Sequence, residues 1–245
     1  MAIQPELDRP AFYALRRGRW RDLITLLHPP YTAWHLSYVA LGAAAAPVVH
    51  VDRLIAALAA FFLAVGISAH ALDELHGRPL GTHISERALV AVAVVGLLGA
   101  IGLGLAGVVT VSVTLLPFVA AGSFLVVAYN LELFGGRFHS DRWFAAAWGA
   151  FPALTGHWVN ALSVDAAGVL VAAACWALSV AQRRLSTPVR ELRRRTTAVE
   201  GHQRMTDGRV TELSAATLAA PLDGALRALS LAVPLLAAGA LALRL

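Results

Sequence analysis

The residues best suited to chemistry gather in one stretch, 70–87, where a long apolar segment ends. This stretch contains His70, Asp73, Glu74 and Arg78. Ionisable side chains at the edge of a membrane-length apolar segment are costly to keep there, so they indicate a functional site. At 3.6 residues per turn, His70, Asp73 and Glu74 share one face of a helix. The stretch therefore predicts a cation-binding cluster that faces a neighbouring helix.

The acids and arginines of this region suit a diphosphate. Carboxylate oxygens, as on Asp73 and Glu74, are the ligands that Mg²⁺ prefers, and Mg²⁺ also bridges phosphate oxygens. Arg78 and Arg137 carry guanidinium groups that match the geometry of a phosphate. The pattern predicts a Mg²⁺-diphosphate site. The alternative is a helix end whose acids and arginines pair with one another at the membrane interface.

A second interpretation uses the histidines. His35 lies near the start of one apolar segment and His70 near the end of the next, so both should lie at a similar depth. Together with Asp73, Glu74 and Glu132 they offer the imidazole and carboxylate ligands of Fe, Mn or Zn. The sequence has no HExxH pattern. The alternative is that each histidine donates a hydrogen bond between helices.

Another group of polar residues closes a later apolar segment. Tyr129, Asn130 and Glu132 are followed by Gly135, Gly136 and Arg137. Two adjacent glycines allow a tight, flexible loop. We interpret Glu132 as a catalytic candidate, and Tyr129, Asn130 and Arg137 as substrate-binding candidates. The alternative is an ordinary solvated turn.

The elements that position these residues follow from composition. The chain has 245 residues, of which 58% are hydrophobic and only 14% charged, and its mean hydropathy is +0.66. Apolar runs of about 20 residues cross a bilayer as helices. We therefore predict an all-α membrane bundle around a cytoplasm-facing cavity, with residues 1–30 as an amphipathic interfacial segment and 31–245 as one transmembrane domain. Its seven predicted spans are 31–49, 54–75, 88–106, 108–130, 143–162, 166–184 and 222–243.

Charge sets the orientation. All 20 basic residues are arginines, and all but Arg53 and Arg244 fall in the amino-terminal segment, in alternate loops or at the start of the last span. The positive-inside rule then predicts a bacterial-type cytoplasmic membrane protein with its amino terminus in the cytoplasm and its carboxy terminus outside. The arginine-rich loop 185–221 is interpreted as a contact for anionic lipid. The basic balance does not indicate nucleic acid, and the single cysteine excludes a disulfide framework.

Three segments carry a resemblance to a known family. They are Leu-Leu-His-Pro-Pro-Tyr-Thr-Ala-Trp-His-Leu at 26–36, Asp-Glu-Leu-His-Gly-Arg-Pro-Leu-Gly-Thr at 73–82, and Tyr129-Asn130 through Trp-Gly-Ala-Phe-Pro-Ala-Leu-Thr-Gly at 148–156. Over roughly residues 20–185 the chain resembles the UbiA-type prenyltransferase superfamily. The resemblance implies a helical membrane enzyme that binds Mg²⁺ and the diphosphate of an isoprenoid donor through aspartate-rich motifs.

The chain departs from that family in several places. Its first motif has only Asp73 and Glu74, and histidines stand at positions 35 and 70, where the family has asparagine or aspartate. The second aspartate motif is not intact: only Glu200-Gly-His202 and Asp207-Gly208-Arg209 remain near its place. The chain is therefore identified as a divergent member.

Three functional hypotheses follow. The first is a metal-dependent enzyme that transfers or cyclises a prenyl diphosphate, with Mg²⁺ held by Asp73 and Glu74 and phosphate held by Arg78 and Arg137. The second is an oxidoreductase or hydrolase with Fe, Mn or Zn held by His35, His70, Asp73, Glu74 and Glu132. The third is a non-enzymatic transporter or assembly protein, which is weakened by the shortage of charge in the outer half.

Overall fold

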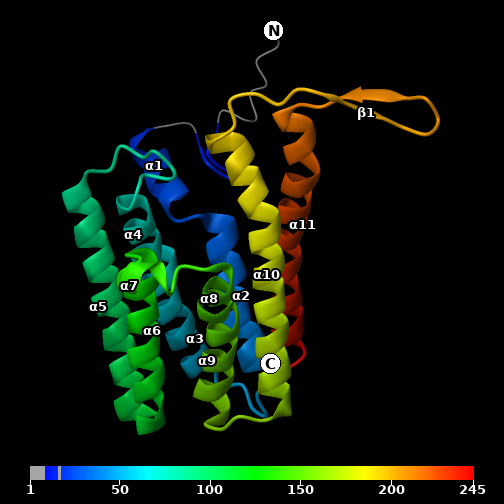
Figure 1. Cartoon of the computed structure of the whole chain (residues 1–245). Helices are drawn as coiled ribbons and strands as arrows, with labels where there is room; N and C mark the ends of the chain where they lie inside the picture. Colours follow the sequence, from blue (N-terminus) through cyan, green and yellow to red (C-terminus); the bar gives the residue numbers. More distant parts are fainter. Residues whose placement is uncertain (1–8, 16–17) are drawn as a thin grey trace.

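The computed structural model describes residues 9–15 and 18–245. Figure 1 shows helices running side by side, with a two-stranded hairpin projecting from one end of the bundle. We call this the hairpin end and the opposite one the far end. In chain order the elements are α1 (Arg19–Leu26), α2 (Pro29–Ala44), α3 (Val51–Phe61), η1 (Phe62–Ala69), α4 (His70–Leu75), α5 (Glu86–Thr110), η2 (Val113–Leu115), α6 (Leu116–Asn130), α7 (Leu133–Gly136), α8 (Asp141–Ala145), η3 (Ala146–Ala150), α9 (Phe151–Ala161), α10 (Ala166–Arg194), β1 (His202–Arg204), β2 (Val210–Glu212) and α11 (Ala215–Ala242).

Within the described part of the chain, five helices are long and apolar enough to cross a bilayer, which fits an integral membrane protein. They are Val51–Leu75, Glu86–Thr110, Val113–Asn130, Ala166–Arg194 and Ala215–Ala242. The predicted count of seven spans is not confirmed. The two other predicted spans correspond to α2, which has 16 residues, and to the continuous α8–η3–α9 helix. Both contribute polar side chains to the interior, and an interior helix does not need the uniform apolar surface that lipid requires.

Helix α2 lies inside the bundle, where it packs against α9 and α11. Two glycines let α2 and α9 approach closely. A Cβ on Gly42 would lie 1.9 Å from the carbonyl oxygen of Ala153, and a Cβ on Gly156 would lie 2.1 Å from that of Val39. Small residues at such crossings allow two backbones to come into direct contact. This crossing fixes the position of the α2 side chains that face the interior.

Two helices contain π-helical segments, η1 and η3. Pro152, just after η3, has no N–H with which to bond the carbonyl four residues earlier, that of Trp148. The Nδ1 of His35 donates to this carbonyl instead, at 2.8 Å. The proline thus frees an acceptor that ties α2 to η3. A short π segment inside a helix is a frequent feature of functional sites.

The hairpin end differs from the loop predicted at 185–221. Helix α10 continues to Arg194, well beyond the predicted end of its span, because residues 185–194 keep a buried helical face that includes Ser186 and Val189. The chain then forms the antiparallel hairpin β1–β2, in which Gln203 pairs with Thr211. Among the described residues, this exposed hairpin holds the strands, and the other regular elements are helical.

The predicted interfacial segment is helical only in part. Of residues 10–28, the stretch Arg19–Leu26 forms α1, and residues 9–15 form neither helix nor strand. Residues 1–8 of the predicted segment, and Arg16 and Arg17 within it, lie outside the described residues.

Candidate functional site

A cavity of about 350 Å³ opens within the bundle towards the hairpin end, and we call it the polar cavity. Its volume falls in the range of small-molecule binding sites. Helices α2, α4, α6, α10 and α11 line it, together with the segment before α1. Its lining includes Pro10, Ala11, Phe12, Tyr13, His28, Tyr31, His35, Val65, His70, Asp73, Tyr129, Asn130, His139, Trp148, Gln182, Arg183, Arg190, Glu191, Arg194, Arg195 and Asp223.

Three of the predicted ligands line this cavity together: His35, His70 and Asp73. His35 is buried and uses Nδ1 to bond the carbonyl of Trp148. The Nδ1 of His70 lies 3.2 Å from the carbonyl of Gly66, one turn earlier. A carbonyl only accepts, so in His35 the proton is on Nδ1 and Nε2 is the basic nitrogen.

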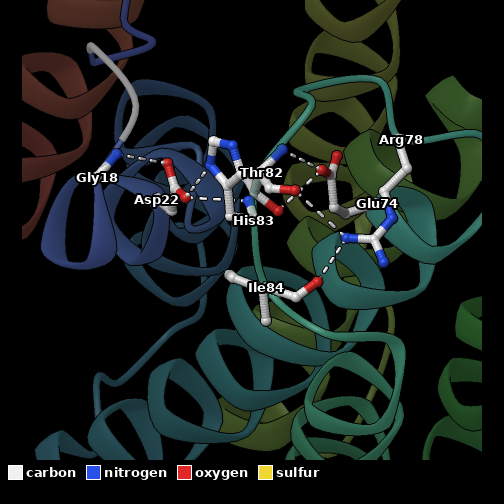
Figure 2. A network of polar contacts seen from close by, with 7 residues as sticks. All are labelled: Gly18, Asp22, Glu74, Arg78, Thr82, His83 and Ile84. Carbon is white, nitrogen blue, oxygen red and sulfur yellow. Dashed lines mark hydrogen bonds and ion pairs between the residues drawn. The ribbon is translucent and has the colours of Figure 1, made fainter.

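Glu74 and Arg78, predicted to bind metal and phosphate, serve the adjacent loop instead (Figure 2). Glu74 is fully buried. Its carboxylate accepts hydrogen bonds from the backbone N–H of Leu80 (2.9 Å) and Thr82 (2.7 Å) and from the Thr82 hydroxyl (2.9 Å). Arg78 donates to the carbonyls of Ile84 (2.6 Å) and Thr82 (3.4 Å). Neither side chain lines the polar cavity, and in this structure both stabilise the adjacent loop.

Asp22 extends the same network (Figure 2). It accepts hydrogen bonds from the backbone N–H of His83 at 3.0 Å and of Gly18 at 3.2 Å. Burial alone would raise the pKa of Asp22, but these hydrogen bonds and the His83 imidazole hold that pKa below its ordinary value. Because hydrogen bonds to a carboxylate stabilise its charged form, Asp22 fastens the loop of residues 76–85 to α1.

The other predicted residues divide into two groups. Tyr129 and Asn130 line the polar cavity, and Tyr129 stacks on His139 with ring centroids 4.5 Å apart. Glu132 and Arg137 are exposed and lie outside it. The Oε1 of Glu132 is 3.7 Å from the Nε2 of His76 and 3.9 Å from that of His139. The second aspartate trace, at Glu200 to Arg209, lies in the exposed hairpin.

Three arginines of α10 were not predicted as site residues. Arg183, Arg190 and Arg194 line the polar cavity, whereas their sequence pattern suggested lipid headgroups. Their spacing of seven and four residues places them on one helical face, and this spacing was the available signal. It was missed because the predicted membrane span ends at residue 184 and the arginines from 183 to 195 are interpreted as contacts for lipid headgroups.

The partners of these arginines differ. Arg183 donates from Nε to Asp141 at 2.8 Å, and Arg194 donates to the carbonyl of Pro10. Arg190 is half-buried and donates to the neutral hydroxyl of Thr187 at 3.1 Å. In the part of the chain that the structure describes, no carboxylate lies within ion-pair distance of Arg190. A half-buried cation without a carboxylate partner in a cavity wall is suited to an anionic ligand.

His28 and Tyr13 also line the polar cavity, although neither was predicted as a site residue. His28 has φ 45°, an uncommon conformation outside glycine. Its ring stacks on that of His70 with centroids 4.1 Å apart. Burial, and next the neighbouring His70, hold the pKa of His28 well below its ordinary value. Burial raises the pKa of Tyr13, so its hydroxyl donates to the neutral His28 Nδ1 at 2.8 Å.

The donor set accommodates Mg²⁺ only together with a phosphate ligand. Among residues 9–15 and 18–245, no group of three or more His, Cys, Asp or Glu side chains could hold a metal ion. Mg²⁺ is commonly bound by one or two carboxylates with phosphate oxygens and water completing its shell, and Asp73 supplies one such carboxylate. The arrangement does not provide the closed imidazole and carboxylate set that Fe, Mn or Zn takes.

A second cavity, of about 240 Å³ and almost wholly apolar, adjoins the first. Val65 of η1 and Trp148 of η3 line both cavities. The apolar cavity extends from this shared wall to Asp52 and Arg53, at the start of α3. Together the two cavities offer a charged compartment at the hairpin end and a hydrocarbon compartment beyond it.

Comparison with known proteins identifies no relative: no family model, no curated protein and no solved structure matches the chain.

Proposed function

We propose that the protein is a membrane enzyme that binds a prenyl diphosphate and transfers or cyclises its isoprenoid group. The observation that carries this proposal is Arg190, a half-buried cation in the polar cavity whose recorded side-chain partner is a neutral hydroxyl. Arg183 and Arg194 add positive charge on the same face of α10. The adjoining apolar cavity supports an amphiphilic ligand, because an isoprenoid chain gains about 25 cal/mol for each Å² of apolar surface removed from water.

The chemistry assigned to this site is cleavage of the bond between the allylic carbon and the diphosphate oxygen. The bonding electrons leave with the diphosphate, whose growing charge the arginines stabilise. A π bond of the acceptor, or of the same chain, supplies the electrons for the new carbon–carbon bond, and the proton then lost goes to the diphosphate or a neutral imidazole. Mg²⁺ carried by the diphosphate and bound by Asp73 would neutralise further charge.

The proposed orientation places the hairpin end in the cytoplasm. The arginines of the hairpin end outnumber those of the far end, where Arg53 and Arg244 lie, and positive loops remain in the cytoplasm. Water-soluble diphosphate would then leave the polar cavity on the cytoplasmic side, and anionic lipid would contact the exposed arginines there.

The test compares Arg190→Gln with Arg184→Gln, a matched change on an exposed face of the same helix. Binding of a prenyl diphosphate and release of inorganic diphosphate are measured on full-length protein in lipid nanodiscs. We expect Arg190→Gln to weaken binding by about 10- to 100-fold, the effect of losing a hydrogen bond to a charged group, and Arg184→Gln to leave it unchanged. Equal behaviour of the two variants would refute the proposal.

Metal content separates the first function from the oxidoreductase or hydrolase alternative. Under the diphosphate proposal, Mg²⁺ should increase binding in the wild type but not in Asp73→Asn. Purified wild-type protein and His70→Ala should both lack stoichiometric Fe, Mn or Zn. A transition metal that is retained by the wild type and lost from His70→Ala would instead establish the alternative.

A second candidate function is movement of an amphiphile across the membrane. The observation that favours it is the arrangement of the two cavities in series, from Arg194 at one end to Asp52 at the other, with Val65 and Trp148 between them. Proteoliposomes that contain a labelled prenyl phosphate distinguish the two functions. Enzymatic release of diphosphate without transbilayer movement of the label favours the transferase, and movement without release favours transport.

A further inference from the structure

The segment of residues 9–15, which we call the lid segment, covers part of the polar cavity. Pro10, Ala11, Phe12 and Tyr13 line the cavity, and the side chain of Ala14 is only 1% exposed. The lid segment forms neither helix nor strand. Its position therefore depends on its contacts with the bundle and not on a hydrogen-bond ladder of its own.

Arginines at the end of α10 hold the outer part of the lid segment. Arg194 donates to the carbonyl of Pro10 from Nε at 3.4 Å and from Nη2 at 3.2 Å, and Arg193 donates to the carbonyl of Arg9 at 3.1 Å. These bonds are solvent-exposed and their acceptors are neutral. An anion adds the Coulomb attraction between opposite charges, and a phosphate can accept two parallel bonds from one guanidinium, so an anion competes well for the same donors.

Aromatic residues hold the inner part. Tyr13 bonds to His28 at 2.8 Å and packs edge-on against Tyr31, with ring centroids 5.3 Å apart. The Arg227 guanidinium lies 5.5 Å from the ring centroid of Phe12. The lid segment is thus fixed at one edge by aromatic contacts in the cavity and at the other by the Arg194 guanidinium, which itself lines the cavity.

We propose that residues 9–15 are a lid that opens when an anionic headgroup in the polar cavity replaces the carbonyl of Pro10 as the hydrogen-bond acceptor of the Arg194 guanidinium. The proposal rests on the proposed function in one respect, the negative charge of the ligand. It adds ligand-controlled access: the entering headgroup releases the segment that covers its own site.

A thiol at position 14 measures the opening. Ala14 is buried and does not line the cavity, so a bound ligand does not shield it directly. The labelling rate of Ala14→Cys by a water-soluble maleimide is measured on full-length protein in nanodiscs, with and without inorganic pyrophosphate. The wild-type protein, whose single cysteine Cys175 is buried, gives the background.

We expect Arg194→Gln to increase the labelling rate about tenfold, from loss of hydrogen bonds made by a charged donor, and Arg184→Gln to leave it unchanged. Pyrophosphate should accelerate labelling when Arg194 is present and should have no effect in Arg194→Gln. Tyr13→Phe, which removes the bond to His28, is a second variant that should also accelerate labelling if Arg194→Gln does not fold.

Two results would overturn the lid. One is that Arg194→Gln and Tyr13→Phe, both folded, leave the labelling rate of Ala14→Cys unchanged. The other is that pyrophosphate does not change the labelling rate of Ala14→Cys when Arg194 is present. Direct calorimetry of pyrophosphate binding separates these results from failure of the proposed function. Pyrophosphate that binds through Arg190 without changing the labelling rate refutes the lid alone, whereas loss of pyrophosphate binding altogether refutes the anion site.

Discussion

Removing the Glu74 carboxylate should destabilise the fold without affecting the ligand site directly. Its two oxygens accept three hydrogen bonds, from the Leu80 and Thr82 N–H groups and the Thr82 hydroxyl, in a fully buried position. Glu74→Ala leaves these donors without their acceptor. Each unsatisfied buried donor costs about 1–3 kcal/mol, so the total loss is on the order of 4 kcal/mol. For a chain of this size that corresponds to a fall of about 10 °C in the unfolding midpoint.

Thermal unfolding followed by circular dichroism in one detergent tests this prediction, with Asp73→Ala as the comparison. Asp73 is half-buried and lines the cavity, so its variant should unfold near the wild-type temperature yet lose Mg²⁺-dependent binding of diphosphate. Glu74→Gln should be intermediate, because its amide retains one acceptor oxygen and directs an N–H group towards a donor. The assignment of Glu74 to the loop would be wrong if Glu74→Ala unfolded at the wild-type temperature.

Two further predictions concern the packing and the pH dependence of stability. Gly156→Ala should lower the unfolding temperature clearly, because its Cβ would lie 2.1 Å from the Val39 carbonyl oxygen. Gly102→Ala, whose Cβ would have no atom within 4 Å, should not lower it. Equal effects of the two changes in the same unfolding assay would contradict the close crossing of α2 and α9. The half-buried His28 has a lowered pKa. Below a pH of about 6.5 the unfolded chain therefore binds a proton that the folded chain does not, and stability falls as pH falls. Asn tolerates the left-handed backbone of position 28, so His28→Asn should reduce this loss of stability between about pH 6.5 and 5, measured by urea titration. A pH dependence of stability equal to that of the wild type would show that His28 does not gain a proton on unfolding.

Helical class and the main apolar segments could be predicted from the sequence because length and hydrophobicity set them directly. The convergence of His35, His70 and Asp73 followed from helix geometry and matched depth. The loop contacts of Glu74 could not be predicted, because in the sequence an acid next to Asp73 resembles a second ligand. Only the folded loop shows that the N–H groups of Leu80 and Thr82 donate to the Glu74 carboxylate.

The arginines of the site were harder to predict for a different reason. An arginine-rich segment at a membrane boundary is attractive to anionic lipid wherever it points, so composition alone does not separate a surface arginine from one in a cavity wall. Extension of α10 to Arg194 settles the direction of Arg190. The amphipathic pattern of residues 1–30 predicts an interfacial segment but not the cavity contacts of the lid segment, because these involve residues far along the chain.

The π-helical segments make the site depend on the number of residues in its helices. Successive residues of an α-helix are rotated by about 100° around its axis, and the wider π turn of Phe62–Ala69 changes the angle at which α4 continues from α3. If η1 wound as a regular α-helix with all its residues kept, His70 and Asp73 would turn away from His35 by about that angle. Such a chain would keep its hydropathy and its membrane spans, and would lose the registration between the two helices on which its cavity depends.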